Sequence, residues 1–127
     1  MNKTEYYCEA GDYAMAANTC ARALENLTRL KNPIGIAKTT LLFGRIFWKS
    51  GDVQTARKFY NESIRLYKSF DIPFGLANCY LEFSEMLASC DLAEESEKFG
   101  SQAQVILDRL RKENASDEAP TKTTVIE

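Results

Sequence analysis

The strongest constraint in this sequence is a repeat, because glycine, proline and aspartate residues recur at intervals of 40 residues. The in-phase pairs are Gly11 with Gly51, Asp12 with Asp52, Pro33 with Pro73, Gly35 with Gly75, and Ala37 with Ala77. Glycine and proline are the residues that depend most on a particular backbone conformation. Their recurrence at the same phase is therefore stronger evidence for a structural repeat than a match of leucines would be. A chain that repeats in this way is expected to fold as a stack of similar units.

Each period contains two segments with the spacing of an amphipathic helix. The first covers about 33–50 and recurs over 73–89, and its small or apolar positions follow the i, i+3, i+4, i+7 spacing of one helix face. The second follows each Gly-Asp pair, and its stripe in the earliest copy is Ala16, Cys20, Ala23, Leu27 and Leu30. We call these segments the first-type and second-type helices. No segment alternates with period two, so the sequence predicts an all-α fold.

Residues that begin or end helices stand between these segments. Asn32 is suited to cap the helix whose first residue is a proline, where a missing N–H costs nothing. Gly51 suits the left-handed turn that closes a helix, and Asp52 can cap the next one. Asp91 and Glu94 have the spacing of a capping box. Because the links are only a few residues long, neighbouring helices are expected to run antiparallel.

Small and bulky residues alternate along the paired helices. The best copy of the pattern consists of Thr40, Phe43, Gly44, Phe47, Gly51, Asp52, Ala56, Tyr60 and Ser63. It resembles the tetratricopeptide repeat (TPR) family, although Thr40 stands where an aromatic is expected and Ser63 where alanine is usual. The period is similar to that of the long-repeat variant of the family, and the resemblance covers roughly residues 3–110. It implies a right-handed α-solenoid of antiparallel helix pairs, with about five helices of which the first is truncated.

The pattern divides the chain into two parts. Residues 1–111 are predicted to form the helical repeat domain, and residues 112–127 a disordered C-terminal tail of small polar residues. The first period starts in the middle of a first-type helix, where Tyr6, Tyr7 and Tyr13 lie close together in the sequence. Either this end meets a partner, a second copy or further repeats of a longer chain, or the tyrosines fold over their own core.

Composition excludes several kinds of chemistry. The 127 residues include no histidine, which excludes His-dependent catalysis and His-ligated zinc or haem. The four cysteines form no CxxC pair, and no glycine-rich phosphate loop occurs. A net charge of −2 gives no basis for binding nucleic acid or an anionic membrane. We therefore predict no enzyme activity, no metal or cofactor, no nucleic-acid or membrane partner, and a cytoplasmic location.

The resemblance also implies a place for ligand binding, because the first-type helices of TPR proteins line a concave groove. By spacing, the predicted partner-binding groove consists of Lys38, Leu41, Arg45, Trp48, Lys49, Asn78, Leu81 and Glu85, with Ala88 and Ser89 farther along the same face and Glu5, Cys8 and Glu9 from the truncated helix. A tryptophan among three cations suggests an acidic peptide or helix with an apolar anchor. Alternatively, Trp48 is half-buried against the next helix and the cations form a solvated face.

Together these features predict a non-catalytic protein–protein interaction module, an adaptor or scaffold that binds a peptide or helix. Two alternatives stay open. The chain can be a peptide- or ligand-sensing part of a larger regulatory protein, or it can form a homodimer through its N-terminal end. The sequence leaves open the identity of the partner, the oligomeric state and whether the chain is complete.

Overall fold

Six helices make up the part of the chain that the structure describes. This computed structural model describes the backbone of residues 2–126 and the side-chain surroundings of residues 2–115, so Met1 and Glu127 lie outside it. The helices are α1 (Lys3–Glu9), α2 (Tyr13–Arg29), α3 (Pro33–Ser50), α4 (Val53–Ser69), α5 (Pro73–Ser89) and α6 (Ala93–Ile126). The all-α prediction is confirmed, with six helices over these residues rather than about five.

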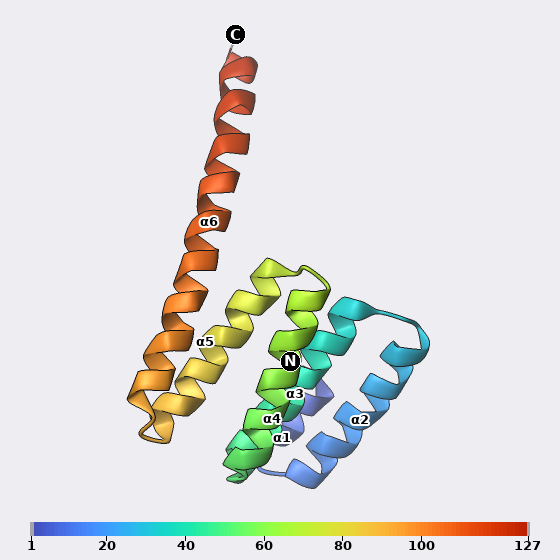
Figure 1. Cartoon of the computed structure of the whole chain (residues 1–127). Helices are drawn as coiled ribbons and strands as arrows, with labels where there is room; N and C mark the ends of the chain where they lie inside the picture. The colour runs from blue at the N-terminus through green and yellow to red at the C-terminus, as the bar shows by residue number, and fades with distance from the viewer. Residues whose placement is uncertain (1, 127) are drawn as a thin grey trace.

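The helices form a row of antiparallel pairs joined by short turns (Figure 1). The pairs are α1 with α2, α3 with α4, and α5 with α6, and each later pair also packs on the one before it through α2–α3 and α4–α5 contacts. The predicted helical solenoid is therefore confirmed. The truncated first helix has 7 residues, against 18 in α3 and 17 in α5.

Most predicted helix ends are found where the sequence places them. The Asn32 side chain accepts a hydrogen bond from the Gly35 backbone N–H at 2.9 Å, as an N-cap does. Gly51 closes α3 in the left-handed conformation with φ of 95°, and Asp52 caps α4. The prediction for Asp91 is wrong by one position, because Asp91 takes the left-handed turn, with φ of 60°, that Gly51 takes in the preceding repeat. Aspartate tolerates this conformation better than most residues.

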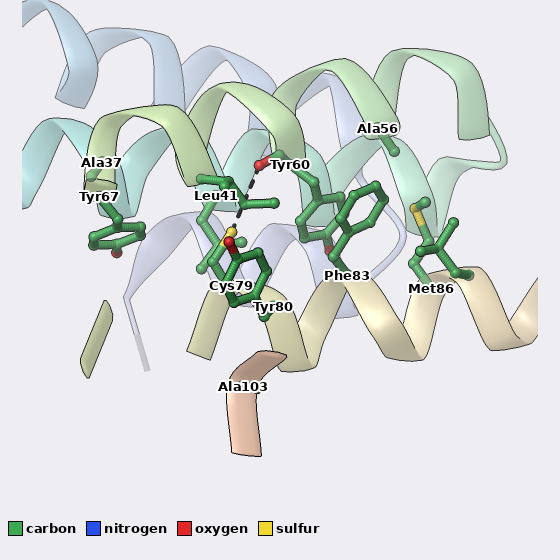
Figure 2. Packing of buried hydrophobic residues seen from close by; sticks show 12 residues of the cluster. Ala37, Leu41, Ala56, Tyr60, Tyr67, Cys79, Tyr80, Phe83, Met86 and Ala103 are labelled. Carbon is green, nitrogen blue, oxygen red and sulfur yellow. Dashed lines mark hydrogen bonds between the residues drawn. The ribbon is translucent and has the colours of Figure 1, made fainter. Parts of the chain in front are cut away.

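The core consists of two clusters of buried side chains. The smaller one joins α1, α2 and α3 through Cys8, Ala16, Cys20, Leu42 and Ile46. The larger one joins α3 to α6, and most of its members are shown in Figure 2. At its centre the Tyr60 and Phe83 rings stack with their centroids 5.2 Å apart. A side chain on Gly44 would meet the Tyr60 ring at 3.0 Å, so the glycine lets α3 and α4 approach closely.

The last helix continues beyond the predicted domain boundary. α6 has 34 residues and runs past residue 111 to Ile126, and its C-terminal part extends away from the other helices (Figure 1). The division into a repeat domain over 1–111 and a disordered tail over 112–127 stays a prediction. Over the described residues, none of the helices has the length and apolar character needed to span a bilayer.

Candidate functional site

A groove of about 560 Å³ crosses the face formed by α1, α3 and α5. Because these helices alternate with α2 and α4 in antiparallel pairs, all three run in the same direction, and equivalent residues of successive repeats lie side by side. The lining residues are Glu5, Lys38, Leu41, Leu42, Arg45, Tyr67, Asn78, Leu81, Glu82 and Glu85. All except Tyr67 of α4 belong to first-type helices.

The floor of this groove is apolar and belongs to the core. Leu41 and Leu42 are each 8% exposed, and Tyr67 is 5% exposed. Leu41 and Tyr67 pack in the larger cluster (Figure 2) and Leu42 in the smaller, so the floor spans the seam between the two clusters. Burial raises the pKa of Tyr67 to about 12, which keeps its hydroxyl neutral at physiological pH. The floor therefore offers a rigid apolar surface.

The repeat arranges many of the lining residues in layers across the groove. The layers are Lys38 with Asn78, then Leu41 with Leu81, then Glu5 with Arg45 and Glu85. The first layer is cationic and polar, the middle layer is apolar, and the third holds one cation and two carboxylates. The outer layers are seven residues apart, which is about 10 Å along a helix.

The single cation of the third layer is already paired. The Arg45 Nε atom donates a hydrogen bond to the Glu82 Oε1 atom at 2.5 Å, and both side chains are partly buried. This hydrogen bond raises the pKa of the Arg45 guanidinium, so the residue stays charged. Because Glu82 balances Arg45, the carboxylates of Glu5 and Glu85 dominate this end of the groove. Lys38 lies at the opposite end, so the groove is bipolar.

Seven of the predicted groove residues line it, namely Lys38, Leu41, Arg45, Asn78, Leu81 and Glu85 together with Glu5 of the truncated helix. Trp48 and Lys49 do not. Trp48 is half-buried and packs against the larger core cluster, and the Lys49 Nζ atom lies 4.1 Å from the centre of its ring. Lys49 instead lines a smaller cavity of about 250 Å³ with Glu5, Cys8, Glu9, Tyr13 and Arg45. Trp48 is therefore half-buried, as the alternative interpretation of the sequence expected.

The predicted groove set did not contain Leu42, Glu82 or Tyr67. Leu42 and Glu82 are equivalent positions of α3 and α5, so the 40-residue period could have brought them in as a further layer. Tyr67 belongs to a second-type helix and reaches the groove from behind. No spacing rule for first-type helices indicates such a residue.

The three N-terminal tyrosines have different surroundings. Tyr7 and Tyr13 are half-buried and pack on the smaller core cluster. Tyr6 is 62% exposed, and its ring meets the Tyr7 ring edge-on with centroids 5.6 Å apart. Two of the tyrosines therefore cover their own core, and the third presents an aromatic surface to solvent.

The cysteines have the surroundings of packing residues. All four are free thiols, and Cys8, Cys20 and Cys79 are buried. Burial raises the pKa of both Cys20 and Cys79 to about 12, so these thiols are protonated at neutral pH. The Cys20 thiol donates to the Thr39 carbonyl and the Cys79 thiol to the Tyr60 carbonyl, which ties α2 to α3 and α4 to α5.

Comparison with known proteins identifies the first part of the chain. A family model described as a tetratricopeptide repeat matches residues 2–69, slightly more than half of the chain. No curated protein and no solved structure matches. The matched residues include α1 to α4, and therefore six of the ten residues that line the groove described above.

Proposed function

Because the chain belongs to the tetratricopeptide repeat family, we propose that it is a non-catalytic adaptor or scaffold module that binds a peptide or helix in the α1–α3–α5 groove. Repeats of this family typically serve as protein-interaction modules. All four cysteines are free, which favours a reducing compartment such as the cytoplasm.

The observation that carries the proposal is the layered, bipolar groove. An extended peptide or a helix could place an apolar side chain against Leu41 and Leu81 in the middle layer. Lys38 and Asn78 would then meet an acidic group or backbone carbonyls, and Glu5 and Glu85 would meet a basic group. The acidic partner predicted from the sequence rested on three cations around Trp48, namely Lys38, Arg45 and Lys49. With Arg45 paired to Glu82, a ligand with opposite charges on either side of an apolar anchor is favoured instead.

Selection from a displayed library of random 12-residue peptides on the immobilised chain, followed by calorimetric titration of the selected peptide, tests this proposal. Leu81→Glu places a charge in the middle layer and is expected to weaken binding by about tenfold or more. Val105→Glu is the matched control, because Val105 is an exposed apolar residue of α6 that does not line the groove. It should leave the affinity unchanged.

Equal effects of the two substitutions would contradict groove binding, as would a library that yields no binding peptide. Circular dichroism of both variants checks that each is folded before the titrations are compared. Leu81 is 38% exposed, so a charged side chain there can reach solvent in the unbound protein. The comparison therefore reports on recognition and not on folding.

A further inference from the structure

A second groove lies at the C-terminal end of the helix stack, between α5 and α6. It measures about 550 Å³ and is lined by small and polar residues, namely Ser84, Ala88, Asp91, Ala93, Ser96, Glu97, Gly100, Ser101 and Gln104. We call it the end groove. No described residue of the chain fills it, although the equivalent surfaces of the two earlier repeats are covered.

The earlier repeats show what covers such a surface. On the α1–α2 pair, Ile46 of α3 packs in one cluster with Cys8 and Ala16. On the α3–α4 pair, Met86 of α5 packs in one cluster with Ala56 and Trp48 (Figure 2 shows Met86 and Ala56). Thus each surface is covered by the next first-type helix of the stack. Forty residues after Trp48 and Ala56 come Ala88 and Ser96, which line the end groove.

The other end of the stack presents the complementary element. α1 is itself the second half of a first-type helix, and its Tyr6 stands 40 residues before Ile46 and 80 before Met86. Ile46 is 2% exposed and Met86 is 0% exposed, whereas Tyr6 is 62% exposed. Tyr6 therefore occupies the position that packs on a preceding helix pair, and no described residue of this chain supplies that pair.

We propose that the end groove of one copy receives α1 of a second copy, with Tyr6 over Ala88 and Ser96. The groove has room for this ring, because Gly100 stands where the earlier repeats carry Cys20 and Tyr60. The polar groups of Glu97, Ser101 and Gln104, which also line the groove, provide partners for the tyrosine hydroxyl.

The two end surfaces both carry carboxylates. The end groove has Asp91 and Glu97, and α1 has Glu5 and Glu9 together with Lys3, so Lys3 is the one side chain of α1 that can form an ion pair with a carboxylate of the groove. The contact is heterologous, since it joins the C-terminal end of one copy to the N-terminal end of the next. It continues the existing stack and does not close on itself as a symmetric dimer would. It also leaves the α1–α3–α5 groove free, so it is independent of the function proposed above.

Sedimentation equilibrium of the 127-residue chain tests the proposal, from about 10 μM to about 1 mM. The average mass is expected to rise with concentration from the monomer value of 14.4 kDa, without stopping at twice that value. Tyr6→Ala and Ala88→Glu should each weaken the association by about tenfold or more. Leu30→Ala removes another exposed large apolar side chain, which belongs neither to α1 nor to the lining of the end groove, and should change nothing.

A mixture of the Tyr6→Ala and Ala88→Glu variants tests the proposed junction most directly. Tyr6→Ala keeps an intact end groove and Ala88→Glu keeps an intact Tyr6, so together they can form one good junction and no more. The proposal predicts that each variant alone stays monomeric while the mixture forms a heterodimer. A wild-type chain that is monomeric at every concentration would overturn the proposal and leave the end groove to another occupant. Self-association that survives Ala88→Glu would overturn it in favour of a symmetric contact through Tyr6.

Discussion

The α3–α4 and α5–α6 pairs both begin with a proline and both have a left-handed residue in the turn between their helices, but they fill the space between the helices differently. In α3–α4, Gly44 faces the large ring of Tyr60, and the ring fills the space that the glycine leaves. In α5–α6 the equivalent residues are Ser84 and Gly100, both small. The Ser84 hydroxyl donates to the Ser96 carbonyl and the Ser96 hydroxyl to the Ser84 carbonyl, which binds the helices without filling the space.

The two pairs show that different residues of the repeat set the helix positions and the filling of the space between the helices. The turns and small residues determine where helices start, stop and approach each other, and they agree between the two pairs. The volume of the residues beside them determines whether the surface becomes core or remains a groove. The covered α3–α4 pair has the large side chain of Tyr60 at this position, and the uncovered α5–α6 pair has Gly100 there.

The largest expected difference between the repeats concerns their equivalent phenylalanines. Phe83 is 1% exposed and stacks on Tyr60, so Phe83→Ala should cost about 3–5 kcal/mol of unfolding free energy. Phe43 is only partly buried and packs on the smaller cluster, so Phe43→Ala should cost about half as much. Urea denaturation followed by circular dichroism measures both. Equal losses would show that the two repeats are packed alike.

A second comparison concerns Gly44 and Gly100. Alanine substitutions at these two positions should change the free energy of unfolding in opposite directions. A Cβ at Gly44 would lie 3.0 Å from a Tyr60 ring that is fully buried, so Gly44→Ala should cost about 1–2 kcal/mol. At Gly100 the Cβ would meet only the Ser84 hydroxyl, at 3.3 Å. Alanine favours a helix interior over glycine, so Gly100→Ala should stabilise by up to about 1 kcal/mol. Destabilisation by both substitutions, in the same urea titration, would show that α5–α6 is packed as tightly as α3–α4.

The smallest expected effect concerns the starts of the two first-type helices. α3 begins with the Asn32 side-chain cap, whereas α5 begins after Ile72, which makes no side-chain cap hydrogen bond. Asn32→Ala should therefore lower the unfolding free energy by about 1 kcal/mol. Asn61→Ala, at an exposed position inside α4, is the matched control and should be neutral or slightly stabilising. A thermal melt in which both variants behave alike would remove the role assigned to the cap.

The local features of this fold could be predicted from the sequence, because each depends on a few neighbouring residues. The Asn32 cap, the Gly51 turn and the Asp52 cap are of this kind. Asp91 was misplaced because an aspartate can cap a helix or take a left-handed turn, and local spacing does not separate the two. The expected count of about five helices already included the truncated α1, and it is one fewer than the six helices of the described residues.

The candidate groove was predictable only in part, for a different reason. The period aligns Leu41 with Leu81 and Lys38 with Asn78, so these positions follow from the sequence alone. The ion pair of Arg45 with Glu82 joins residues 37 apart, and it depends on how closely α3 and α5 lie. The burial of Trp48 likewise depends on the side chains of the larger core cluster against which it packs. Such lateral contacts between repeats carry no signature in a single sequence.

The central claim is that ligands bind across the layers of α1, α3 and α5. Amide chemical shifts of the isotope-labelled chain, recorded during titration with the selected 12-residue peptide, test it most directly. We predict that the largest changes fall on residues 38–45 of α3 and 78–85 of α5, with smaller changes around Glu5. Changes concentrated on α2 and α4, or around the end groove of α5 and α6, would contradict the claim.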